Sequence, residues 1–268
     1  MTTDHSAHLA LPAHLSARHR DLIAALVERN EHEHGDGLLG LVLSGSAGRG
    51  LATERSDVDI YVVLTDDAIQ QRSIARSTEV DEIPIALSAL ERVPPFGSEE
   101  WWFRWSFAWA PVLLDRTDGR IARAAGRQAT LGLDEHDVVL IEHDRLDGWI
   151  NYAYRALKSD RDGRARERRL DAAESMPWLL DVVFTLAGRV RPYHKYLPWE
   201  LREHPLTDWP HGTLLDLLER TLEGDPAAIR DTFSRVETLC EAHDAERDRE
   251  TLRSVIQGWG QELTLFRA

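Results

Sequence analysis

Two short polar motifs near the N-terminus contain the residues best suited to chemistry. Gly45 and Ser46 follow one apolar run, and Asp57 and Asp59 begin the next, with ten residues (47–56) between Ser46 and Asp57. Side chains at positions i and i+2 of a strand point to the same face, so the two carboxylates are predicted to lie side by side. Paired carboxylates repel each other unless a cation lies between them, and hard oxygen ligands suit Mg²⁺. The spacing therefore predicts a magnesium site at the edge of a strand.

The Gly45-Ser46 turn is suited to binding phosphate groups. Glycine lets the backbone approach a ligand closely, and N–H groups together with the Ser46 hydroxyl can hold phosphate oxygens at the start of a helix. Protein-bound Mg²⁺ usually shares its coordination shell with the phosphates of its substrate. We therefore predict that ATP is the nucleotide donor and that its β- and γ-phosphates lie at this turn. Transfer at the α-phosphate would then depend on positioning and on charge neutralisation.

These motifs resemble the signature of the polymerase-β nucleotidyltransferase superfamily, in which a Gly-Ser pair is followed after ten residues by Asp-x-Asp, with a strand before and a strand after. Arg49 belongs to the same match, as the arginine of a G-S-x-x-R-G variant, and Ser56 precedes the first aspartate. The superfamily includes aminoglycoside and lincosamide nucleotidyltransferases, minimal nucleotidyltransferase antitoxins and poly(A) polymerases. The resemblance implies an enzyme whose nucleotide-binding residues include Gly45, Ser46, Arg49 and Ser56.

A third carboxylate normally completes such a metal site and activates the acceptor. In bacterial single-chain members it stands at the start of the following strand, where this chain has Asp81 and Glu82 after a valine. The resemblance implies that Asp81 is the third metal ligand and the general base, with Glu82 as the alternative. Neighbouring residues of a strand point to opposite faces, so only one of the two can join Asp57 and Asp59.

A basic residue in the second half of the chain is expected to complete the phosphate site. Related two-domain nucleotidyltransferases close the cleft with a helical domain that brings such a residue to the phosphates, and the resemblance extends more loosely through residues 188–196. It implies this role for Lys195, with Arg189 and Arg191 as alternatives. The competing interpretation is a structural segment between helices whose charges face water.

The net charge and the cysteine content of the chain argue against several classes of function. The formal net charge of −14 opposes sequence-independent binding to phosphate backbones, which relies on clustered Lys and Arg. The single cysteine, Cys240, cannot form an internal disulfide, and no apolar run approaches the roughly 20 residues needed to span a bilayer. We therefore expect a cytoplasmic protein without membrane association or general nucleic-acid binding. The sequence is silent on oligomeric state.

Periodicity predicts the elements that position these residues. A helix from about residue 15 to 30 precedes two strands at 38–44 and 58–64, and residues 79–87, interrupted by a proline, predict a third strand at a sheet edge. The polar Thr65-Asp66 pair can cap a helix that continues to about Arg76.

The second half of the chain is helical almost throughout from residue 134 onward. The predicted fold class is therefore α+β. A nucleotidyltransferase domain at 1–132, with a small mixed sheet flanked by helices, is followed by a helical bundle domain at 133–268.

Together, these features predict Mg²⁺-dependent transfer of AMP from ATP to a hydroxyl group, with release of pyrophosphate. Among acceptors, the resemblance favours a small molecule such as an aminoglycoside-like antibiotic, which would make the chain an antibiotic-resistance enzyme. Two alternatives stay open. One is a protein-modifying (AMPylating) transferase; the other is a non-catalytic nucleotide-binding or antitoxin-like interaction protein without a working third acid.

Overall fold

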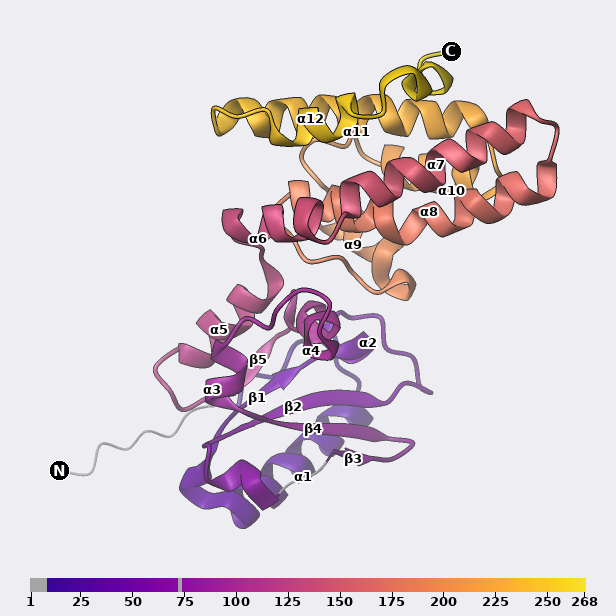
Figure 1. Ribbon diagram of the computed structural model, residues 1–268. Coiled ribbons are helices and arrows are strands. Elements are labelled where there is room, and N and C mark those ends of the chain that lie inside the picture. The colour runs from indigo at the N-terminus through magenta and orange to yellow at the C-terminus, as the bar shows by residue number, and fades with distance from the viewer. Residues whose placement is uncertain (1–8, 72–73) are drawn as a thin grey trace. The chain divides into compact units, whose positions relative to one another are not determined.

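The chain divides into two compact units in a computed structural model that describes residues 9–71 and 74–268. The units are Met1–Thr130 and Leu131–Ala268 (Figure 1). Among the described residues, the first unit has two hydrophobic clusters of its own and the second unit has one. The division into a nucleotidyltransferase domain at 1–132 and a helical domain at 133–268 stays a prediction.

The first unit is built on a mixed sheet, as predicted, and this sheet has five strands in the described residues. Its strands are β1 (Leu38–Leu43), β2 (Val58–Leu64), β3 (Ala75–Arg76), β4 (Val80–Ala86) and β5 (Val112–Asp115), in the order β3-β4-β2-β1-β5. β2 and β4 run parallel, and the other neighbouring pairs are antiparallel. Its helices are α1 (Ala17–His34), α2 (Gly45–Gly48), α3 (Leu87–Glu91), α4 (Glu99–Phe103) and α5 (Arg120–Ala129).

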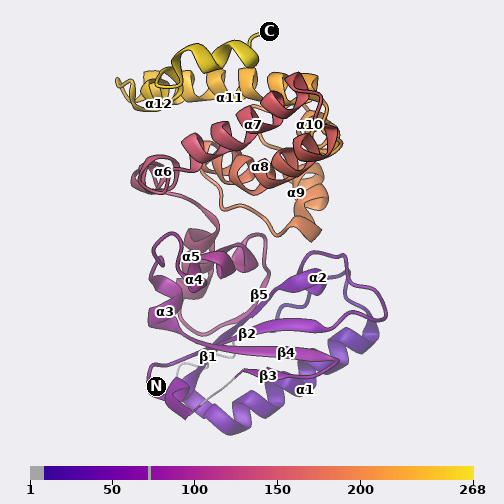
Figure 2. The same ribbon diagram turned by 45° about the vertical axis from the view of Figure 1, so that its right-hand side comes forward.

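Helices cover both faces of the sheet, and alternate residues of β2 separate the two cores. Val58 and Ile60 are fully buried in the cluster that contains Ile23 of α1. Tyr61 belongs to the other cluster, with Leu90 of α3 and residues of α5. Figure 2 shows α1 along one side of the sheet, with α3 and α5 on the other. Because strand side chains alternate, odd-numbered residues of β2 face away from α1.

The segment after β2 differs from the prediction of a helix reaching Arg76. A short 3-10 helix, η2 (Ala68–Gln71), follows β2, residues 72–73 lie outside the described part of the chain, and β3 pairs antiparallel with β4. β4 is therefore not the edge strand that its proline predicted. Within the described residues, β3 pairs with Asp81 and Glu82 and not with Pro84, so these ladder pairs do not require an N–H from the proline.

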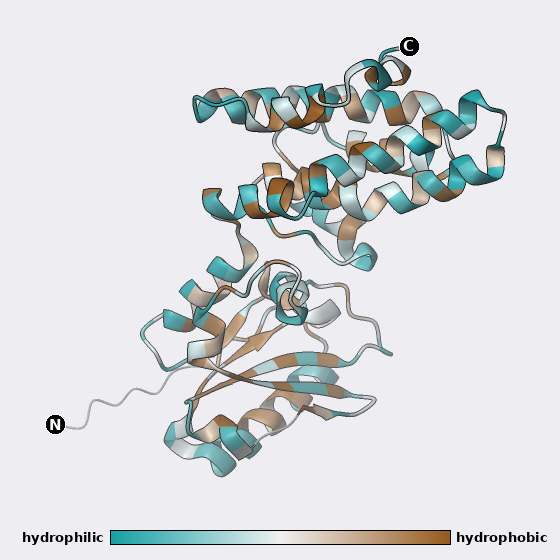
Figure 3. Cartoon of the chain, viewed as in Figure 1, coloured by the Kyte–Doolittle hydropathy of each residue, from teal (hydrophilic) through white to brown (hydrophobic). Residues whose placement is uncertain are grey.

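The second unit is helical, as predicted. Its helices are α6 (Leu133–Asp137), α7 (Arg145–Arg161), α8 (Ala165–Leu186), α9 (Leu197–Glu203), α10 (Thr213–Leu222), α11 (Pro226–Glu246) and α12 (Thr251–Gln257). Figure 3 shows hydrophobic residues along the strands and between these helices, with hydrophilic residues at the turn that joins α7 and α8. Within the described residues, no helix combines the length and apolar character needed to cross a membrane.

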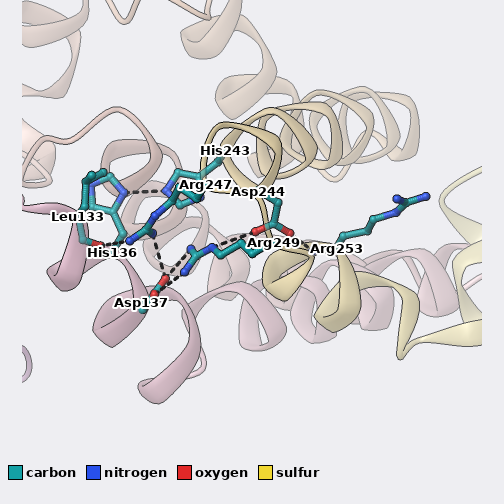
Figure 4. A network of polar contacts seen from close by, with 8 residues as sticks. All are labelled: Leu133, His136, Asp137, His243, Asp244, Arg247, Arg249 and Arg253. Carbon is teal, nitrogen blue, oxygen red and sulfur yellow. Dashed lines mark hydrogen bonds and ion pairs between the residues drawn. The ribbon is translucent and has the colours of Figure 1, made fainter.

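A polar network ties α6 to α11 and to the chain that follows α11 (Figure 4). The rings of His136 and His243 share a hydrogen bond of 3.0 Å between Nδ1 and Nε2. Asp137 accepts two hydrogen bonds from Arg249, at 2.5 and 2.6 Å. Burial, with smaller contributions from His243 and Arg247, lowers the pKa of His136 from 6.5 to about 4. The pKa of His243 is lowered in the same direction, again chiefly by burial.

The buried histidines predict that stability falls as pH falls from about 6.5 to about 4. In that window the unfolded chain binds a proton at residue 136 that the folded chain does not, so acid favours unfolding. At about 1.36 kcal/mol per pKa unit, the loss amounts to up to about 3 kcal/mol. Urea unfolding followed by circular dichroism at several pH values measures it. In His136→Gln, the free energy of unfolding should fall less steeply as pH falls, whereas the exposed His32→Gln should behave as the wild type does. An equal dependence on pH in both variants would contradict the assignment to His136.

Candidate functional site

The sheet brings two of the three predicted aspartates, Asp59 and Asp81, to one face. Asp59 of β2 and Asp81 of β4 are register partners in the parallel pair, so their side chains share a face. That face is opposite α1, because the adjacent Val58 and Ile60 are buried against α1. Asp57 precedes β2 by one residue and lies outside the strand, so its place in the site stays a prediction. Asp57, Asp59 and Asp81 are all partly buried, as expected for carboxylates at the rim of a site.

Glu82, the alternative third carboxylate, lies on the other face of β4. It is the register partner of Ile60 and forms an ion pair with Arg29 of α1. Only 5% of the Glu82 side chain is exposed. Its carboxylate therefore links α1 to the sheet through the ion pair with Arg29. Of the two acids, Asp81 is the one that shares a face with Asp59.

Arg76 is a neighbour of this site that the sequence did not reveal. It is the register partner of Asp81 across β3 and β4, and its Nε lies 3.6 Å from Asp81 Oδ2. The interpretation of residues 65–76 as a helix concealed this pairing. An alternating pattern cannot be recognised in a strand of two residues, so only the pairing itself identifies Arg76.

The Gly45 turn packs directly against the Asp59 carboxylate. Gly45 has φ +58°, and a Cβ atom at this position would lie 1.7 Å from Asp59 Oδ2, so only glycine fits. The Ser44 N–H donates to the Asp59 carbonyl at 2.8 Å, which fixes the turn to β2. Helical bonding in α2 begins with the Gly48 N–H, which donates to the Ser44 carbonyl. The amides of Ser46 and Ala47 thus precede the first helical hydrogen bond.

Arg49, predicted to bind nucleotide, has its guanidinium turned into the protein. The group donates to the carbonyls of Gly45 at 2.9 Å, Trp105 at 3.1 Å and Ala108 at 2.9 Å. It also lies 4.0 Å from the centre of the Trp105 ring. Arg49 is buried, and these contacts make it a positioning residue that holds the Gly45 turn against the 105–108 segment.

Arg49→Lys is expected to destabilise the first unit by about 1–3 kcal/mol, because a single ammonium group cannot replace the forked guanidinium and would leave buried carbonyls unsatisfied. Urea unfolding of the full chain measures the effect. Arg55→Lys, at an exposed position of the same connection, is the matched control. Equal stability of the two variants would show that the buried contacts of Arg49 are dispensable.

Ser56 also has a local structural role. Its Oγ accepts from the Thr53 N–H at 2.9 Å, and its carbonyl accepts from Arg18 of α1 at 3.3 Å. These contacts shape the connection immediately before Asp57. The predicted contact between Ser56 and nucleotide stays a prediction.

Among the three basic residues predicted for the phosphates, Lys195 is the most exposed. It lies in the 3-10 helix η5 (His194–Tyr196), with its Nζ 4.8 Å from the centre of the Tyr196 ring. Arg189 forms an ion pair with buried Glu200, and Arg191 pairs with Asp181 at 3.2 Å. Both arginines thus have partners inside the second unit. The role of Lys195 at the phosphates stays a prediction.

The carboxylates fit Mg²⁺ by the chemistry of their oxygen donors. No three His, Cys, Asp or Glu side chains within residues 9–71 and 74–268 already form a cluster that could hold a metal ion. Mg²⁺ does not require such a cage, because it commonly binds one or two carboxylates, substrate phosphates and water. Asp59 and Asp81 side by side, next to a turn suited to phosphates, are compatible with that mode of binding.

Comparison with known proteins identifies the domain that carries these residues. Residues 23–99 match the family model "Nucleotidyltransferase domain", and comparison with curated proteins found no match. Among solved structures, a nucleotidyltransferase-like protein from Exiguobacterium sibiricum is 15% identical, with 90% of this chain and 77% of that chain covered and a TM-score of 0.35. At that TM-score the likeness carries no weight, and the family match stands on its own. Residues 23–99 of this chain therefore form a nucleotidyltransferase domain of the polymerase-β type.

Proposed function

We propose that the protein transfers AMP from ATP to a hydroxyl group of a small molecule. The observation that supports this most directly is the pairing of Asp59 with Asp81 on the face where the Gly45 turn meets the Asp59 carboxylate. In the reaction, the acceptor oxygen forms a bond to the α-phosphorus while the bond from that phosphorus to the bridging oxygen breaks. Pyrophosphate leaves, and the acceptor proton passes to Asp81.

Each residue of the site has a task in this proposal. The amides and hydroxyl of the Gly45-Ser46 turn hold the outer phosphates of ATP, and Asp57, Asp59 and Asp81 hold Mg²⁺. When bound, Mg²⁺ neutralises negative charge on the reacting phosphates. Asp81, on the side of β2 away from the turn, accepts the proton from the acceptor. Lys195 of the second unit binds the phosphates. We also propose that the protein is cytoplasmic.

The test is incubation of the purified protein with α-labelled ATP, Mg²⁺ and a panel of hydroxyl-bearing compounds that includes aminoglycosides and lincosamides. Pyrophosphate release together with label on one compound supports the proposal and names the acceptor. Label on protein instead supports the AMPylating alternative. ATP binding without pyrophosphate release in the presence of any of these compounds supports the non-catalytic, antitoxin-like alternative and contradicts the proposal.

A further inference from the structure

A pocket opens on the same face of the sheet as the aspartates. Tyr61 and Ile83 line it, and they lie two residues beyond Asp59 and Asp81, respectively. Residues at i and i+2 share a face, about 7 Å apart along the strand. The cavity measures about 370 Å³, which is within the usual range for small-molecule sites. All its lining residues belong to the first unit.

The pocket lies on the acceptor side of the proposed reaction. The Gly45 turn, proposed to hold the triphosphate, follows β1, whereas the pocket is lined by Ile83 and Ile85 of β4, and β1 and β4 flank β2 on opposite sides. Arg76 connects the pocket with the proposed base, because it lines the pocket and lies 3.6 Å from Asp81. A molecule in the pocket therefore lies next to the carboxylate that would take its proton.

The lining of the pocket defines the chemistry of its occupant. Its walls are mainly apolar and aromatic, and they include Tyr61, Ile83, Phe103 and Phe107. Within the described part of the chain, the charged side chains that line it are three arginines and one glutamate, Arg76, Arg92, Arg104 and Glu100. Arg104 is buried and donates to backbone carbonyls, so the exposed charges of the lining are those of Arg76, Arg92 and Glu100, which leave a small excess of positive charge in a chain of net charge −14. Such a site suits an apolar ring system, neutral or anionic, and opposes a polycation.

We infer that this pocket binds the apolar part of the acceptor and that the acceptor is a largely apolar, hydroxyl-bearing molecule without multiple positive charges. The inference rests on the proposed function, because it assigns the acceptor of that reaction. The inferred acceptor therefore differs from the aminoglycoside-like antibiotic that the sequence resemblance favoured.

The test uses anilinonaphthalenesulfonate, an anionic aromatic fluorophore, as the probe for the pocket in the full-length protein. Ala89 lines the pocket from α3, so Ala89→Phe should fill it and weaken probe binding at least about tenfold. Ala122→Phe, on the exposed face of α5, is the matched control and should bind the probe as the wild type does. Saturating Mg²⁺–ATP should leave the probe bound, because the donor and acceptor sites are distinct.

A second variant tests the site without changing a buried position. Phe103 lines the pocket yet is 48% exposed, so Phe103→Asp places a carboxylate at the pocket without opening the core. It should also weaken probe binding about tenfold, whereas Trp109→Asp, at a position 47% exposed outside the pocket lining, should not.

The outcomes separate this inference from the proposed function. Probe binding that is unchanged in both Ala89→Phe and Phe103→Asp, or displacement of the probe by Mg²⁺–ATP, overturns the acceptor assignment even if the enzyme transfers AMP to another compound. Conversely, failure to bind ATP or to release pyrophosphate contradicts the proposed function, whatever the probe does. Transfer to hydroxynaphthalenesulfonates in preference to aminoglycosides, lowered at least about tenfold by Ala89→Phe, completes the positive result.

Discussion

Asp59→Asn is expected to abolish measurable AMP transfer while the protein keeps its fold. The Asp59 carboxylate lies between the Gly45 turn and Asp81, where the proposed reaction concentrates negative charge. An amide cannot supply the same charge for Mg²⁺, and metal-based charge neutralisation contributes several kcal/mol to such reactions. Since about 1.36 kcal/mol corresponds to a tenfold rate change, we expect a loss on the order of a thousandfold in kcat. Pyrophosphate release with α-labelled ATP measures it.

The substitution is nearly isosteric, so the loss should not arise from unfolding. Asp57→Asn should act in the same direction, because it changes the second carboxylate of the motif. Asp67→Asn, at an exposed position after β2, is the matched control and should retain wild-type kcat. Transfer by Asp59→Asn within about tenfold of the wild type, with unfolding curves that coincide, would remove Asp59 from the metal site.

The strands that hold the aspartates were predictable from local sequence, since the apolar run at 58–64 matches β2. The segment after β2 was not. Its capping residues suggested a helix, whereas β3 exists only as a partner of β4, and propensity cannot register a pairing between separate segments. Arg76 was missed for that reason.

The roles of two motif residues also depended on distant parts of the chain. Alternation predicted that only one of Asp81 and Glu82 could join Asp59, but the choice depends on α1, whose Arg29 lies 53 residues before Glu82. Similarly, the motif identified Arg49, but two of the carbonyls that it binds, those of Trp105 and Ala108, belong to residues more than fifty positions later. Local spacing identifies candidate residues, whereas tertiary contacts determine on which face each residue lies and which partner it contacts.

A comparison of Asp81→Asn with Glu82→Gln separates catalysis from stability at neighbouring positions. Asp81→Asn removes the proposed general base, so kcat should fall by about 10²- to 10⁴-fold while the Kd for ATP changes little. Glu82→Gln should keep kcat within a few-fold of the wild type, because its side chain lies on the opposite face of β4. It should nevertheless destabilise the protein by about 1–2 kcal/mol, because a neutral amide at this buried position cannot form the ion pair with Arg29.

The two variants change the same chemical group by the same replacement, so each serves as the control for the other. Pyrophosphate release gives kcat, calorimetry gives the Kd for ATP, and urea unfolding gives stability. The pattern that supports the site is a loss of kcat confined to Asp81→Asn and a loss of stability confined to Glu82→Gln. The reverse pattern would place the third acid on the face covered by α1. If both variants kept full activity, neither acid would be the base, and proton transfer would have to involve another group near Asp59.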